Sequence, residues 1–280
     1  MRRVVVSLVC LFQSFFMLFS QQKEALTTVN DATMIGIGSC NTMDTYLSDE
    51  GYSGTGYRLM NERIKNLASN PRVSLQQTID VQYSKQLNTM MSASTLAAFL
   101  DYKLNYYYRF SPLPSLNILT GGGAHAMTGV LYNTRNGNNP ASAKLDLSLN
   151  LSLMATYNVR IKSYPIMLRY QIDTPLVGAM FAPNYGQSYY EIFSLGNTEG
   201  VVRMNSPFNK FALRNYFSVD FPIAGVTFRA GYIGNYYQTD VNNIQHHMRS
   251  HSFVLGFVRE FSSFRKNIQK SKSIKSALYQ

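Results

Sequence analysis

The residues best suited to catalysis in this chain are histidines and serines gathered in one short segment near its C-terminal end. His246, His247 and His251 lie there with Ser250 and Ser252. A histidine that takes the proton of a serine hydroxyl turns that oxygen into a nucleophile for ester carbonyls. The segment therefore raises the hypothesis of acyl hydrolysis, with His251 as the base.

A second group consists of charged residues that recur at alternate positions along much of the chain. Alternate placement puts side chains on one face of an extended strand. Such a face forms either a salt-bridge network that fills an interior or a pore lining that selects solutes by charge. The residues predicted to share it are Arg58, Glu62, Asp80, Asp101, Lys103, Arg109, Lys144, Asp146, Arg169, Asp173, Arg214, Asp220 and Arg229.

A third candidate is the stretch from Phe181 to Glu191, which combines amides, aromatic rings and a carboxylate. Tyrosine rings stack on sugars, and neighbouring amides supply hydrogen bonds, so the stretch suits sugar or peptide groups. Alternatively, it folds inward as packing. The predicted binding residues are Asn184, Tyr185, Tyr189, Tyr190 and Glu191.

The elements that must position these residues are β-strands. From Lys144 to Tyr157 leucines and other large residues alternate with Asp, Ser and Asn. A period of two over more than ten residues indicates a long strand with one apolar and one polar face. Such strands are typical of a closed membrane barrel with lipid outside and polar side chains inside. A soluble β-sandwich or lipocalin-like barrel, which uses fewer and shorter strands, is the alternative.

The whole pattern predicts an all-β fold, a transmembrane antiparallel up-and-down barrel of about 12 strands. The pair 189–195 and 201–205 is the least regular, and without it ten strands remain. If Phe261 ends on the periplasmic side, short turns at 111–115 and 222–225 are periplasmic, and loops at 133–142, 175–188 and 238–246 face outside. The other predicted strands are 34–47, 55–65, 73–84, 96–110, 116–130, 144–157, 164–174, 211–221, 226–237 and 247–261.

The barrel hypothesis supplies a partner for His251. Ser252 follows it directly and points to the opposite face, so Ser39, on the first strand, is the remaining nucleophile if the first and last strands pair. The alternative is that these histidines lie at the membrane interface beside lipopolysaccharide phosphates.

The chain ends define four segments. Arg2 and Arg3 precede an apolar run, which predicts a secretory signal peptide over residues 1–20. A lead-in (21–33), the barrel (34–261) and a basic tail (262–280) follow. The tail and the signal carry seven of the basic residues behind the formal charge of +11, leaving about +4 elsewhere. This distribution and export argue against nucleic-acid binding.

Cysteine usage excludes a disulfide framework. After removal of the signal, Cys40 is the only cysteine, and the chain has no Cys/His cluster with metal-ligand spacing. We expect no metal and no cofactor.

Three stretches carry a resemblance: Thr42 to Arg63, Phe181 to Asn197 and Gln245 to Phe253. They resemble a family of Gram-negative, Bacteroides-type outer-membrane β-barrel proteins that is catalogued only as a domain of unknown function. The resemblance implies an outer-membrane barrel and no particular activity.

The predicted function is binding or passage of a small polar solute by an outer-membrane barrel in contact with outer-membrane lipid and lipopolysaccharide. The alternatives are an outer-leaflet acyl hydrolase and a structural or adhesive barrel acting through its outer loops. An enzymatic role depends on the His251 hypothesis alone.

Overall fold

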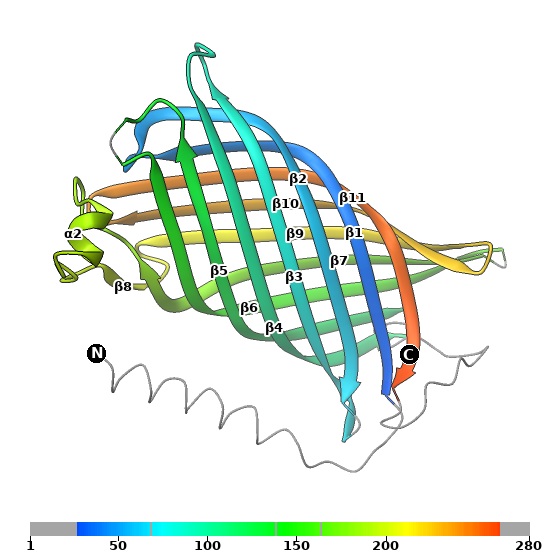
Figure 1. Cartoon of the computed structure of the whole chain (residues 1–280). Coiled ribbons are helices and arrows are strands. Elements are labelled where there is room, and N and C mark those ends of the chain that lie inside the picture. The colour runs from blue at the N-terminus through cyan, green and yellow to red at the C-terminus, as the bar shows by residue number, and fades with distance from the viewer. Residues whose placement is uncertain (1–26, 68, 138, 163, 264–280) are drawn as a thin grey trace.

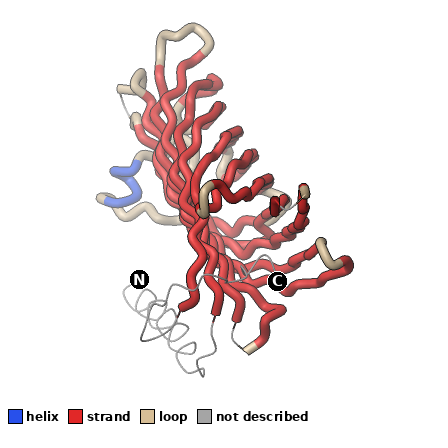
Figure 2. Tube along the Cα trace, turned by 90° about the vertical axis from the view of Figure 1, so that its right-hand side faces the viewer, coloured by secondary structure: helices blue, strands red, loops and turns tan. Residues whose placement is uncertain are grey.

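The computed structural model describes residues 27–67, 69–137, 139–162 and 164–263. The predicted signal peptide and nearly all of the basic tail lie outside these residues. Strands form almost the whole molecule (Figure 2). The elements are β1 (Thr27–Asp44), β2 (Ser48–Leu67), β3 (Asn70–Asn88), β4 (Ser94–Leu113), β5 (Leu116–Asn133), β6 (Ala141–Ile161), β7 (Tyr164–Phe181), α2 (Tyr189–Phe193), β8 (Val202–Asn205), β9 (Lys210–Ile223), β10 (Val226–Val241) and β11 (Ile244–Ser263).

Ten of the strands close into an antiparallel barrel (Figure 1). The first and last strands, β1 and β11, pair along their whole length, and β6 pairs with β7. The order around the barrel is β1 to β7 and then β9 to β11. The short β8 pairs with the end of β7 and adds no full wall strand. The up-and-down barrel is confirmed with ten wall strands, the alternative to a count of about twelve, and the pair 189–195 and 201–205 adds no full wall strand.

The error in the count comes from residues 189–195, which were expected to form a strand and instead contain α2. Ser188 precedes the helix, and its hydroxyl accepts from the backbone N–H of Glu191 at 3.2 Å. The Glu191 carboxylate accepts from the backbone N–H of Ser188 at 2.7 Å. This reciprocal capping box satisfies free N–H groups of the first turn and stabilises a helix where alternation suggested a strand.

The two ends of the barrel differ in their connections. At the end near Thr27 and Ser263 the connections are short, for example Pro114–Ser115 and Ala224–Gly225. At the opposite end, called the loop end here, lie the connection 134–140 and the long segment 182–209. The expected loops at 175–188 and 238–246 are shorter than predicted, because β7 continues to Phe181 and a two-residue turn joins β10 to β11.

That turn is Asn242–Asn243, whose φ angles are 57° and 60°. Two successive positive φ values are typical of the type I′ hairpin turn, and asparagine tolerates them well. Strand ends also differ from expectation at the barrel's seam. β1 begins at Thr27, before Met34, and β11 ends at Ser263, after Phe261.

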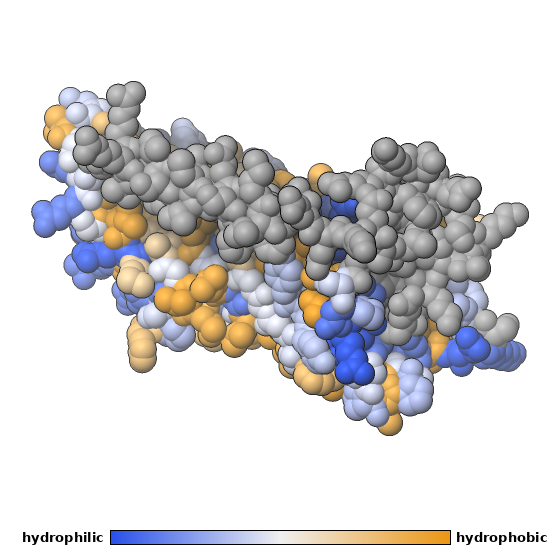
Figure 3. Space-filling view, turned by 90° about the horizontal axis from the view of Figure 1, so that it is seen from below, coloured by the Kyte–Doolittle hydropathy of each residue, from blue (hydrophilic) through white to orange (hydrophobic). Residues whose placement is uncertain are grey.

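The two faces of the wall have opposite character. Side chains such as Leu147, 65% exposed, and Phe253, 72% exposed, cover the outer face. Figure 3 shows orange apolar side chains on the visible wall and hydrophilic residues toward the ends. Polar and charged side chains of the same strands point into the lumen and are buried. Within the described residues, no helix has the length and apolar character needed to cross a membrane.

A group of buried ion pairs crosses the middle of the lumen. One oxygen of Glu62, on β2, contacts the guanidinium groups of Arg169 on β7 and Arg229 on β10, each at 2.6 Å. Arg229 also pairs with Asp220 on β9 at 2.6 Å. One step toward the loop end, Asp80 contacts Arg58 at 2.6 Å and Arg214 at 2.7 Å. These contacts tie strands on opposite sides of the barrel together.

Apolar layers lie on both sides of this ionic centre. Ile64, Tyr107, Leu119, Met154 and Met167 form one cluster on the side of the chain ends. The other, toward the loop end, is called the loop-side layer here. It consists of Ala97, Phe99, Met127, Leu131 and Met248, with Leu47 and Tyr237 packed against it.

We predict that Glu62→Gln destabilises the barrel by about 3–5 kcal/mol, because it leaves Arg169 without its buried carboxylate and Arg229 with Asp220 alone. Heat-modifiable gel migration and the unfolding midpoint in detergent measure this loss. The matched control is Glu199→Gln, on the exposed connection 182–209, which should leave both unchanged. Equal midpoints for the two variants would contradict the role assigned to Glu62.

Candidate functional site

The charged residues predicted to line the lumen all lie there. Most of them form ion pairs with one another, as the Glu62 and Asp80 groups show. Lys103 contacts Asp173 at 3.2 Å, and Lys210 contacts Asp146 at 2.6 Å. Arg109, nearer the chain ends, donates to Asn66 at 3.0 Å. The lining therefore fills the interior at its centre, and only part of it borders open space.

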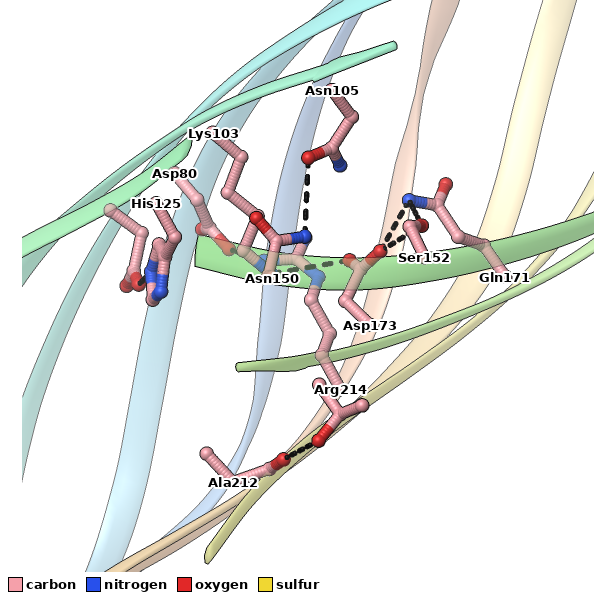
Figure 4. Close-up of polar contacts among 12 residues, drawn as sticks. Asp80, Lys103, Asn105, His125, Asn150, Ser152, Gln171, Asp173, Ala212 and Arg214 are labelled. Atoms are coloured by element: carbon pink, nitrogen blue, oxygen red, sulfur yellow. Dashed lines mark hydrogen bonds and ion pairs between the residues drawn. The ribbon is translucent and has the colours of Figure 1, made fainter. Parts of the chain in front are cut away.

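That space is a cavity of about 50 Å³ between the ionic centre and the loop-side layer. Asp101, Lys103, His125, Asp173 and Arg214 contribute charged or titratable groups to its wall. They come from β4, β5, β7 and β9, and in Figure 4 the polar ends of Lys103, Asp173 and Arg214 approach one another from different strands. We call this space the lumen cavity.

Each charged group of the lumen cavity contacts an ionisable partner. His125 Nε2 lies 2.7 Å from an Asp101 oxygen, and Lys103 faces Asp173. Arg214 is held by Asp80, and Asp173 also accepts from Gln171 at 2.9 Å and from the Ser152 hydroxyl. Paired charges of this kind offer little net attraction to an ion.

The neutral amide side chains that line the lumen cavity have fewer hydrogen-bond partners than its charged groups. Gln82 Nε2, Asn150 Oδ1 and Asn235 Oδ1 are buried and have no hydrogen-bond partner among the described residues. All three residues line the cavity. Gln82 is 7% exposed and Asn150 is 5% exposed. Because an unpaired buried polar atom costs about 1–3 kcal/mol, these atoms indicate a place for a bound polar group that both donates and accepts.

Sequence reasoning did not single out these amides or His125. Each lies at an inward position of its strand, so strand alternation alone was a sufficient signal for the direction of the side chain. Which inward residues remain unpaired depends on partners from other strands. That information appears only when the barrel is closed.

The proposed catalytic pair lies on the outer wall. Ser39 on β1 is directly opposite His251 on β11, and both point away from the lumen. Directly opposed residues have Cβ atoms about 4.5–5.5 Å apart. The Tyr232 hydroxyl on β10 lies 2.5 Å from His251 Nδ1 and fixes the orientation of the ring. Ser39 and His251 are therefore brought together at one height, with Tyr232 as a third member.

An apolar groove adjoins this group on the same wall. Ile37, Tyr57, Phe217, Tyr232 and Phe253 line it, and the small Ala230 widens it. Phe253 is the next outward residue after His251 toward the chain ends. The groove thus runs along the outer face below Ser39 and His251, where an alkyl chain would meet only apolar side chains.

The five residues predicted to bind ligand in the connection 182–209 have different surroundings. Tyr189 stacks on Phe181 at 6.3 Å between ring centroids, and its hydroxyl accepts from the backbone N–H of Ala143 at 2.6 Å. Asn184 donates to Gln187, and Glu191 is engaged in the helix cap. Tyr185 and Tyr190 are exposed. The first three residues stabilise the connection itself, and two tyrosines remain for external contact.

The side chains of Tyr46 and Glu191 both form hydrogen bonds that hold the connection 182–209 in place. The Tyr46 hydroxyl, in the turn between β1 and β2, donates to the Gln187 carbonyl at 2.8 Å, and burial raises the pKa of Tyr46 to about 12. Hydrogen bonds from the backbone and side chain of Ser188 lower the pKa of the Glu191 carboxyl. Because β1 and β6 lie on opposite sides of the barrel, contacts to Tyr46 and Ala143 carry the connection across the mouth.

The described residues hold no group of three or more His, Cys, Asp or Glu side chains arranged to bind a metal ion.

Comparison with known structures finds membrane barrels at low sequence identity. The outer membrane protease OmpT from Escherichia coli is 8% identical, with 86% of this chain and 99% of that chain covered and a TM-score of 0.43. The transport unit of the autotransporter AIDA-I from Escherichia coli is 9% identical, with 88% and 94% covered and a TM-score of 0.41. An outer membrane channel from Pseudomonas putida F1 is 9% identical, with 87% and 98% covered and a TM-score of 0.32.

Comparison of sequences gives the family. No curated protein matches the chain. The model of a family described as a protein of unknown function, DUF3316, matches residues 4–268, which is nearly the entire chain. The chain belongs to the DUF3316 family of proteins of unknown function.

Proposed function

We propose that this protein is a non-conducting outer-membrane barrel that binds a small hydroxylated group in the lumen cavity. The observation that carries the proposal is the set of unpaired amide atoms of Gln82, Asn150 and Asn235 in a cavity whose charges are already paired. Hydroxyl groups donate and accept at once, so a polyol or sugar group matches these atoms better than a simple ion does.

Binding is favoured over passage because the lumen is blocked at several heights. The Glu62 group crosses the centre, and apolar layers lie on both sides of it. The connection 182–209 covers the mouth. The outer-membrane location rests on the barrel architecture and the apolar outer face, and the Bacteroides-type origin stays a prediction.

Planar-bilayer recording tests the absence of conduction. The refolded protein, whose insertion is verified by heat-modifiable migration, should give no discrete conductance steps, because no water-filled path crosses the Glu62 group. Reproducible single-channel steps from inserted protein would contradict a blocked lumen and restore transport as the leading function.

Binding is tested with glycerol and glucose as probes, and with choline chloride and sodium acetate as ionic comparators. Saturation-transfer NMR on the protein in detergent should detect a polyol and neither ion. Asn150→Leu should weaken polyol binding about tenfold, which corresponds to about 1.4 kcal/mol for one buried hydrogen bond.

The matched control for this experiment is Asn117→Leu, an inward amide near the chain ends that does not line the lumen cavity. Equal loss in both variants, or saturation transfer to the ions alone, would overturn the proposal of a hydroxyl-binding cavity.

A second candidate function is acyl-ester hydrolysis at the outer wall, favoured by the opposition of Ser39 and His251 and by the bond from Tyr232. In this reaction His251 Nε2 takes the proton of Ser39 as Oγ attacks the ester carbonyl carbon. The ester C–O bond then breaks, the leaving alcohol receives the proton, and water releases the fatty acid from the acyl-serine. The apolar groove would hold the alkyl chain.

Ser39→Ala and His251→Ala should each reduce fatty-acid release from phosphatidylethanolamine vesicles by roughly 10²–10⁴-fold if this reaction occurs. Tyr232→Phe should reduce the rate less, because the histidine remains. Ser53→Ala, on the neighbouring strand β2 and also outward, is the control. Absence of release by the unmodified protein, or release that survives Ser39→Ala, removes this candidate.

A further inference from the structure

The wall of the barrel is interrupted beside the lumen cavity, between β7 and β9. Their ladder ends where Asp173 lies opposite Arg214. It does not resume until Gly178 of β7 lies opposite Asn205 of β8. Between these points lie residues 174–177 of β7 and residues 206–213 of the opposite segment. Because four residues are opposite eight, the two segments cannot remain in register.

Two features of β7 produce this interruption. Pro175 has no backbone N–H and cannot donate to a ladder. The Ala212 carbonyl, at the matching height of β9, accepts instead from the Thr174 hydroxyl at 2.9 Å. On its other side β7 bulges, because Pro175 is opposite Asn150 and Val177 is opposite Leu149, leaving Leu176 without a partner. A bulge bends the strand and displaces its local pairing.

The lumen cavity borders the strands of this seam. Its inner wall consists of inward residues, but Thr174, Leu213 and Tyr236 also border it. These three alternate with inward residues along β7, β9 and β10 and therefore lie on the outer side of the wall. The cavity therefore extends into the wall between the strands.

Toward the loop end, the loop-side layer lies between the cavity and the mouth. The loop-side layer draws residues from β4, β5 and β11 and, with Leu47 and Tyr237, extends across the lumen. Gly129 makes room for one of its members, since a Cβ atom at this position would lie 2.2 Å from the Phe99 ring. The connection 182–209 covers the mouth beyond this layer.

The outer surface around the seam is apolar. Leu176, Val177 and Phe211 are exposed there, and Phe208, in the segment between β8 and β9, is fully exposed. A ligand that arrives from this side has to cross hydrocarbon, and its apolar part can remain there while its polar part enters.

We infer that the β7–β9 seam is a lateral portal through which the hydroxylated head group of a membrane lipid enters the lumen cavity. The head group meets Asn150 and Gln82, and the alkyl chain stays on the outer wall beside Leu213 and Tyr236. This inference rests on the proposed function, because it names the ligand class and the entry route for the same cavity.

The route is tested by cysteine labelling in liposomes, in a chain whose Cys10 and Cys40 are replaced by Ser. Asn150→Cys places a thiol in the lumen cavity opposite Pro175. N-dodecylmaleimide should modify it at least tenfold faster than a sulfonated, water-soluble maleimide does. Adding Leu213→Trp at the outer side of the seam should slow this reaction about tenfold, whereas Leu147→Trp, elsewhere on the outer wall, should not.

Equal or faster labelling by the sulfonated reagent would place the entrance at an aqueous end and overturn the portal. No labelling by either reagent, while a Leu147→Cys thiol reacts with N-dodecylmaleimide, would show a sealed wall and also overturn it. Neither result affects the binding of glycerol or glucose, so failure of the portal is distinguishable from failure of the proposed function.

The ligand class is tested by native mass spectrometry of protein extracted from vesicles of phosphatidylethanolamine mixed with monoglucosyl diacylglycerol. The unmodified protein should retain the glucolipid, and Leu213→Trp and Asn150→Leu should each reduce retention at least tenfold. Leu147→Trp is the control for the change in wall surface. Equal retention of phosphatidylethanolamine and glucolipid, or retention unaffected by both seam and cavity variants, would overturn a hydroxylated head group as the ligand.

Discussion

The interaction on which the rest of the structure depends is the sharing of one Glu62 oxygen by Arg169 and Arg229. A carboxylate at the centre of a packed lumen is stable only with charged and hydrogen-bonding partners. Because Glu62 lies on β2 and these two arginines lie on β7 and β10, the group neutralises buried charge and also joins strands across the barrel. It occupies the centre of the lumen, and the lumen cavity lies on its loop side.

The lumen cavity follows from this arrangement. Ion pairs lie on one side of the cavity and the loop-side layer lies on the other. Between them is a short stretch of the lumen in which some side chains have no oppositely charged partner and do not fill the space. The amides of Gln82 and Asn150 lie in this stretch. These unpaired amide atoms differ from the neighbouring ion pairs, because an amide atom without a hydrogen-bond partner can still bind a neutral polar group. Recognition at this site would therefore depend on hydrogen bonds more than on net charge.

The interruption at Pro175 places local weakness in a wall that is otherwise continuously bonded. A closed barrel satisfies its backbone groups between neighbouring strands, and a proline with an adjacent bulge removes part of this bonding. Thr174 replaces one missing donor with its hydroxyl. The compensation keeps the Ala212 carbonyl satisfied while the strands separate, so the opening does not leave that acceptor unpaired in hydrocarbon. The outer-wall group of Ser39, His251 and Tyr232 is independent of the seam and uses only regular strand register.

The amino-acid sequence by itself determined the barrel class and the direction of nearly every strand side chain, because a period of two is a local property of the backbone. Arg58, Glu62 and Asp173 were assigned to the interior, and Ser39 and His251 to the exterior, on this ground alone. It did not determine the strand count, since the Ser188–Glu191 capping box competes locally with strand alternation. Only the tertiary structure decided which inward charges pair, which amides remain free and where the wall opens. Those outcomes depend on contacts between strands distant in sequence, whose relative heights are fixed only when β1 and β11 close the barrel.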